Sequence, residues 1–163
     1  MSFVFNNKGT AAATGSTTLL LVPSVVHYPF YVNFLNVWNK DNGDDPQVPA
    51  DYTLVYTAQG GVASSGTDTG NAQASVFMRQ IPEYSTSSQT RVVFTSAVDV
   101  AIGNSALYSR DITRAWSTGS AIAADTSTGA GFLFSASVNI NIRPDDILLA
   151  SVALNSDLVG PPT

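Results

Sequence analysis

Apolar and polar residues alternate along several stretches of the chain with the period of two that is typical of β-strands. The clearest stretch is 132–143 (FLFSASVNINIR), where every even position is apolar and the odd positions after Leu133 are polar. The same alternation gives one strand face to Tyr52, Leu54, Tyr56 and Ala58, and another to Val92, Phe94, Val98, Val100 and Ile102. These patterns predict strands with one buried face and one face in water.

Shorter runs rich in Val, Ile, Phe, Tyr and Thr predict further strands. They are Ser2–Asn6, Thr17–Val22, Phe30–Trp38, Ala74–Arg79 and Ile147–Leu154. Segment Leu107–Trp116 fits one helix face as well as one strand face, and its Ile and Thr content favours the strand. Segments rich in Gly, Pro, Ser and Asp predict the loops, at Asn39–Asp51, Gln59–Gln73, Gln80–Gln89 and Ser117–Gly131.

The pattern as a whole predicts an all-β fold. No segment has a long helical stripe, and 163 residues suit a single domain. Eight or nine short strands without an internal repeat favour one antiparallel β-sandwich of jelly-roll or Greek-key type over residues 1–163. The end of the chain, 158–163, is expected to form a short extended arm because its Gly-Pro-Pro sequence cannot continue a hydrogen-bonded ladder.

Composition narrows the classes of partner. Charged residues make up 12% of the chain, the net charge is −5, and Lys and Arg do not cluster, so we expect no nucleic-acid binding. The longest apolar stretch, Leu19–Val26, is interrupted by Pro23 and Ser24, and we expect no membrane insertion. The first residues lack the basic start and early apolar core of a signal peptide. The absence of cysteine excludes disulfides, thiolate metal sites and cysteine nucleophiles.

Candidate catalytic chemistry is sparse. His27 is the only histidine and no G-x-S-x-G motif occurs, so we expect no hydrolase triad, no zinc site and no enzyme activity. The acidic cluster Lys40–Asp45 lacks the spacing of a calcium loop and is interpreted as a solvated turn. We therefore predict no catalytic, metal-binding or cofactor-binding residue and no cofactor. Tyr84, followed by the small polar residues Ser85–Ser88, is the candidate for an exposed ring that contacts a ligand.

Several of these features occur together along the full length of the chain. It has no cysteine and no signal sequence, its loops are rich in Ser, Thr, Ala and Gly, and its strands alternate as in FLFSASVNINI. In this it resembles the small β-sandwich structural proteins of viruses, which include single jelly-roll capsid, decoration and spike subunits. It departs from capsid proteins that have a basic, genome-neutralising arm, since Lys8 is the only basic residue in 1–18. The resemblance implies a shell, decoration or spike role.

The function that follows from this resemblance is that of a structural assembly subunit of a virion. The sandwich would act as a rigid tile that contacts copies of itself and other structural subunits, forming a homo-oligomer. The interface residues expected in its terminal arms are Phe3, Phe5, Leu158 and Val159. The alternatives are a glycan-binding or receptor-binding head domain, and a pilus-like subunit assembled by strand addition. The expected location is the virion, or alternatively the extracellular space.

Overall fold

The computed structural model describes residues 4–23, 31–41, 45–60, 64–65, 68–69, 71–81 and 89–109. Most of these residues lie in seven β-strands, namely β1 (Val4–Pro23), β2 (Tyr31–Asp41), β3 (Thr53–Gly60), β4 (Ser64–Ser65), β5 (Asp68–Thr69), β6 (Asn71–Gln80) and β7 (Gln89–Ser109). The described part is thus all-β, with antiparallel sheets consistent with a β-sandwich. None of it forms a helix that is long and apolar enough to cross a membrane.

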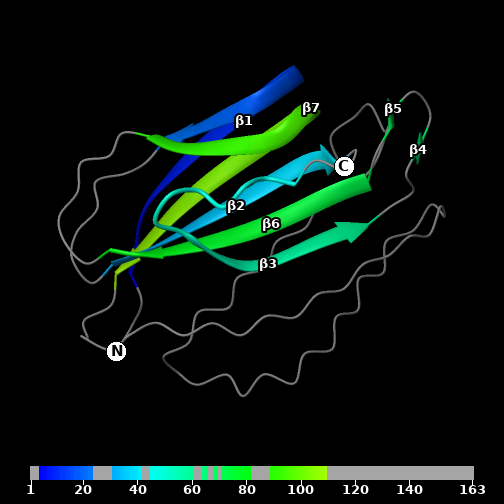
Figure 1. Cartoon of the computed structure of the whole chain (residues 1–163). Coiled ribbons are helices and arrows are strands. Elements are labelled where there is room, and N and C mark those ends of the chain that lie inside the picture. Colours follow the sequence, from blue (N-terminus) through cyan, green and yellow to red (C-terminus); the bar gives the residue numbers. More distant parts are fainter. Residues whose placement is uncertain are drawn as a thin grey trace, which may run out of the picture.

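Five of the strands form one sheet in the order β1-β7-β2-β6-β3 (Figure 1). Each neighbouring pair is antiparallel, and β2, which pairs with β7 and β6, is the central strand because it is third in the order of five. The short strands β4 and β5 pair only with each other. Among the described strands, β1 and β3 are therefore the edges of the main sheet.

The two longest strands, β1 and β7, bend together and double back over the sheet (Figure 1). Their register shifts twice near the bend, and between the pairs Thr17–Val98 and Leu19–Val93 β1 advances two residues while β7 advances five. Extra residues on one strand form bulges, which bend and twist a ladder. The residues after the bend in β1, 19–23, and those before it in β7, 89–93, form a second layer that lies on the five-stranded sheet. We call this layer the folded end.

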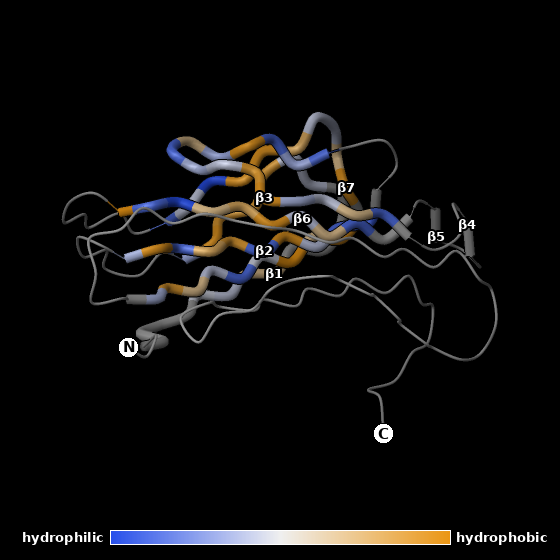
Figure 2. Tube along the Cα trace, turned by 90° about the horizontal axis from the view of Figure 1, so that it is seen from below, coloured by the Kyte–Doolittle hydropathy of each residue, from blue (hydrophilic) through white to orange (hydrophobic). Residues whose placement is uncertain are grey.

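The main core fills the space between these two layers. Leu20, Val22 and Val92 of the folded end pack with Leu35 of β2 and Phe77 of β6 in one buried cluster. Apolar positions recur along these strands, as the orange segments of Figure 2 show. The remaining residues of this cluster are Val37, Tyr52, Phe94, Val98 and Ala101. Removal of this apolar surface from water is the main force that holds the folded end on the sheet.

The opposite face of the main sheet carries a second, smaller cluster. Val32 and Phe34 of β2 are buried there with Val76 and Met78 of β6. The ring of Phe34 meets the ring of Tyr108 edge to face, with 6.0 Å between the centroids and 74° between the planes. The central strands therefore bury side chains on both faces, which explains why Phe30–Trp38 reads as a nearly continuous apolar run.

Bulges make two of the predicted strand faces wrong. Val92, Phe94 and Val98 are buried as expected, but Val100 and Ile102 are exposed and Ala101 is buried instead. The change of parity in β7 lies beside the register shift between Thr14 and Thr17 of β1, opposite Val100 and Val98, where the two strands bend. In β3, a shift between Leu54 and Tyr56 likewise leaves Leu54 exposed.

The strand boundaries also differ from those predicted. Ser2–Asn6 and Thr17–Val22 were expected as separate strands, whereas one continuous strand, β1, runs through both from Val4. The expected loop Gln59–Gln73 contains β4 and β5. Of the ambiguous segment, Leu107–Ser109 lies in β7, and the rest lies outside the described residues together with the predicted strands 132–143 and 147–154.

We predict that Gly103→Ala destabilises the protein by about 1–3 kcal/mol, because the added methyl group would overlap buried Val22 and crowd Leu20. A Tm lower by several degrees in thermal unfolding would agree with this estimate. Thr95→Ala, at an exposed position of the same strand, is the control and should change the Tm little. An unchanged Tm for Gly103→Ala would mean that the second layer does not lie on β7 at this point.

Candidate functional site

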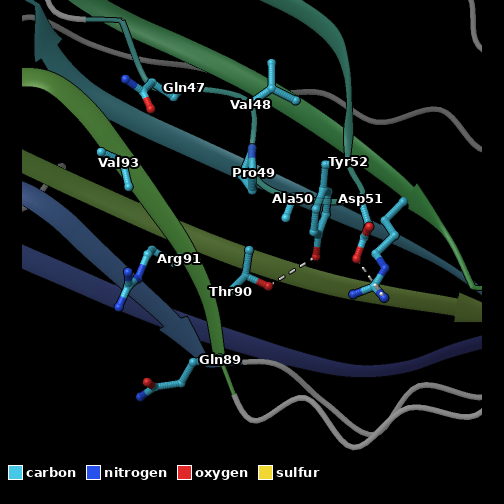
Figure 3. Close-up of a pocket in the computed structure, with 11 residues that line it drawn as sticks. Gln47, Val48, Pro49, Ala50, Asp51, Tyr52, Gln89, Thr90, Arg91 and Val93 are labelled. Atoms are coloured by element: carbon cyan, nitrogen blue, oxygen red, sulfur yellow. Dashed lines mark hydrogen bonds and ion pairs between the residues drawn. The ribbon is translucent and has the colours of Figure 1, made fainter.

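The candidate site is a cleft between the start of β7 and the segment that precedes β3 (Figure 3). Its volume is about 340 Å³, which lies within the range of small-ligand pockets. Residues from β6 and β7 line it together with those of the connecting segment, namely Gln47, Val48, Pro49, Ala50, Asp51, Tyr52, Arg79, Gln89, Thr90, Arg91 and Val93. The cleft exists because the bend in β7 brings residues 89–93 beside this segment.

A tight turn shapes one wall of the cleft. The Tyr52 N–H donates to the carbonyl oxygen of Pro49 over 3.1 Å, which closes a four-residue turn. Asp51, the third residue of this turn, has φ = 66°, a conformation that costs a non-glycine residue about 1–2 kcal/mol. Asp and Asn tolerate it better than other residues because their short side chains bond locally. The turn thereby aims Asp51 at the rim of the cleft and Tyr52 at its floor.

The floor is a hydrogen bond between two hydroxyl groups. The Tyr52 and Thr90 hydroxyl oxygens lie 3.2 Å apart in a buried position, and either can donate. In Figure 3, Thr90 points toward Tyr52, while Gln89 and Arg91 lie on the other side of the strand. Burial raises the pKa of the Tyr52 phenol, although the Thr90 hydrogen bond and the Arg79 charge act in the opposite direction. The phenol is therefore held neutral and serves as a hydrogen-bonding group, not as a base.

An ion pair forms the rim on the β6 side. Arg79 Nη2 lies 3.4 Å from Asp51 Oδ2. The Arg79 side chain is only 20% exposed, whereas that of Asp51 is 71% exposed, so water screens the carboxylate far more than the guanidinium. This long, single contact uses little of the hydrogen-bonding capacity of the guanidinium, which has five donors.

Of the acidic cluster Lys40–Asp45, residues 42–44 lie outside the described residues, and Asp45 does not line the cleft. Its last residue, Asp45, accepts a hydrogen bond of 2.5 Å from the Gln73 side-chain amide, which also donates to Thr57 over 3.2 Å. Asp45 is thus held by the sheet at the β6 edge. Within the described residues, no group of three or more His, Cys, Asp or Glu side chains is placed to hold a metal ion.

The structure places one of the predicted contact residues. Phe5 lies in β1, where its backbone faces that of Tyr108 in β7. Phe3, Leu158, Val159 and Tyr84 lie outside the described residues. The predicted arm contacts therefore stay predictions.

The residues of the cleft were not singled out from the sequence. Tyr52 was expected as an ordinary strand residue, and Arg79 and Arg91 lie at the ends of runs predicted as strands. The sequence signal for an interrupted strand edge was the pair of prolines Pro46 and Pro49. Proline has no N–H to donate to a ladder, so strand pairing is interrupted at these positions.

We predict that Tyr52→Phe costs about 0.5–1.5 kcal/mol of unfolding free energy, because it removes the hydrogen bond to Thr90 while keeping the buried ring. Chemical denaturation of both proteins measures this difference. Tyr56→Phe, in a half-buried position of β3, is the matched control. Equal losses of unfolding free energy in both variants would mean that the hydrogen bond between Tyr52 and Thr90 does not stabilise the fold.

The raised pKa of Tyr52 also predicts an alkaline effect. A group with a higher pKa in the folded state than in the unfolded state stabilises the fold below the unfolded value, about 10, and loses this contribution above it. The unfolding free energy of the wild type should therefore fall more steeply above about pH 10 than that of Tyr52→Phe. Parallel curves for the two proteins would contradict this assignment.

Comparisons of the chain with protein-family models, curated proteins and solved structures gave no match. The chemistry of the cleft and the function of the chain have to be inferred from the residues themselves.

Proposed function

We propose that this protein is a structural assembly subunit, a β-sandwich tile of jelly-roll or Greek-key type with eight or nine strands. It acts through contacts with copies of itself and with other structural subunits. The assembly that we propose for it is a virion. The terminal residues Phe3, Phe5, Leu158 and Val159 belong to this proposal as arm contacts.

The observation that carries the proposal is an apolar outer surface on the folded end of the β1–β7 strand pair. Leu20 and Val22 point into the core, so the alternating residues Leu19 and Leu21 point outward, and both are exposed. Leu19 lies opposite the half-buried Val93 across the ladder. Single exposed apolar residues are common on monomers, but side chains gathered on one strand face favour an interface. We call Leu19, Leu21 and Val93 the leucine surface.

The position of this surface in the sheet adds to the argument. It lies on β1, which is an edge among the described strands, so a neighbouring subunit can approach it from the side as well as from above. Burial of each leucine against a neighbour would contribute about 1.5–3 kcal/mol before the cost of association. Two leucines in every subunit are enough to direct a repeated contact in a symmetric assembly.

The double variant Leu19→Ser, Leu21→Ser is expected to weaken self-association by at least about a hundredfold, because two buried leucines would be lost from each contact. Analytical ultracentrifugation over a range of concentrations gives the association constant. The Tm should fall less than on truncation of the buried Leu20, since the Leu19 and Leu21 residues are 36% and 41% exposed.

Leu54→Ser is the matched control, because Leu54 of β3 is 42% exposed and Leu21 is 41% exposed. It should leave association unchanged if the leucine surface is the contact. Equal loss of association in both proteins would refute the proposed surface. A wild-type protein that stays monomeric at every concentration would refute the assembly function.

A further inference from the structure

The start of β7 presents backbone hydrogen-bonding groups to the cleft. The carbonyl oxygen of Val93 accepts a hydrogen bond of 2.8 Å from the Gln47 N–H, next to the bridge between Pro46 and Phe94. In an antiparallel ladder, every second residue directs its N–H and C=O to the same side. Arg91, two residues before Val93, therefore directs both groups to the cleft and away from β1. No partner for them occurs among the described residues.

Proline explains why the ladder stops there. The next donor to the β7 edge after Gln47 would be the N–H of residue 49, which would bond to the carbonyl of Arg91. Residue 49 is proline and has no N–H. Its carbonyl oxygen, which would accept from the Arg91 N–H, instead accepts from Tyr52 within the turn. The chain thus keeps a short strand edge open inside a cleft.

The charges around the cleft favour an acidic occupant. Arg79 and Arg91 are among its lining residues, Arg91 on the opposite side of β7 from Thr90, and Asp51 lies beside Arg79, so the lining carries one net positive charge. The whole chain has seven basic and twelve acidic residues and a net charge of −5, which makes this local excess of positive charge unusual. The poorly solvated Arg79 has a single long contact to Asp51 Oδ2 and retains donors for a second carboxylate.

We propose that this cleft binds a short extended acidic peptide segment of a partner chain. The segment adds as a strand beside Arg91, with its backbone donating to and accepting from that residue, and directs a carboxylate to Arg79. Backbone pairing supplies affinity in such strand addition, and the side chain supplies specificity. The volume of about 340 Å³ limits the bound part to a few residues. The cleft adjoins the leucine surface and shares Val93 with it, but the peptide contacts Arg79 and the Arg91 backbone, so peptide binding and self-association can fail separately.

Synthetic peptides separate the two kinds of contact. The probe is a blocked five-residue peptide of alternating valine and aspartate, with binding to the full chain measured by calorimetry. Asparagine in place of aspartate should weaken binding by at least about tenfold, because a charge-assisted hydrogen bond is lost. Proline in place of valine should abolish binding, because it removes the backbone donors. Equal binding of all three peptides, or binding of free acetate with the same affinity, would overturn the proposal.

Substitutions in the protein test the same site independently of the peptide changes. Pro49→Ala restores an N–H that can pair with Arg91, so we expect weaker peptide binding by at least about tenfold and slower hydrogen exchange of the Arg91 amide. Arg79→Gln should weaken binding of the aspartate peptide but not of the asparagine peptide. Lys40→Gln, at the far end of β2, is the control for charge and should change neither. Rapid hydrogen exchange of the Arg91 amide in Pro49→Ala, together with unchanged peptide binding, would refute the proposal that the peptide pairs with the backbone of Arg91.

Discussion

Close packing of Val22 and Leu20 on Gly103 holds the folded end of the β1–β7 strand pair against the five-stranded sheet. Any side chain at residue 103 would occupy the space of these two residues, and the same holds at Gly9, where a Cβ would overlap the backbone of Pro23. Glycine has no side chain and lets two backbones approach where other residues cannot. The two glycines thus allow one long pair of strands, β1 and β7, to contribute to both layers around the main core.

Both proposed contact surfaces depend on this bend. It turns Leu20 and Val22 inward and so leaves Leu19 and Leu21 on the outside, which creates the leucine surface. It also brings residues 89–93 beside Gln47, where one hydrogen bond forms and Pro49 prevents the next. A rigid tile with an apolar face and an open strand edge has two distinct ways to contact neighbours, one through side chains and one through backbone. Such a pair of contacts suits an assembly protein better than a ligand-processing one.

The sequence predicted the fold class and much of the strand positions, because alternation and β-branched residues depend on local chemistry alone. It did not predict the parity changes at Leu54 and Val100, since a bulge depends on the partner strand. The 20-residue β1 was missed because Ala11 to Gly15 have low strand propensity and are held by pairing with β7. The cleft was missed for a similar reason, because Tyr52, Arg79 and Thr90 meet only after the bend forms.

The central claim is that the folded end of the β1–β7 strand pair lies on the sheet at Gly103, and nuclear Overhauser effects test it most directly. We predict a strong effect between the Gly103 α-protons and the Val22 methyl groups, alongside those expected for the ladder pair Val22–Thr90. Gly103 and Val22 would be far apart in an unbent β1–β7 ladder, although the ladder pairs Ala11–Gly103 and Val22–Thr90 would be kept. Observation of these two ladder contacts without the Gly103–Val22 contact would show an unbent pair of strands, and would contradict the two layers, the leucine surface and the cleft together.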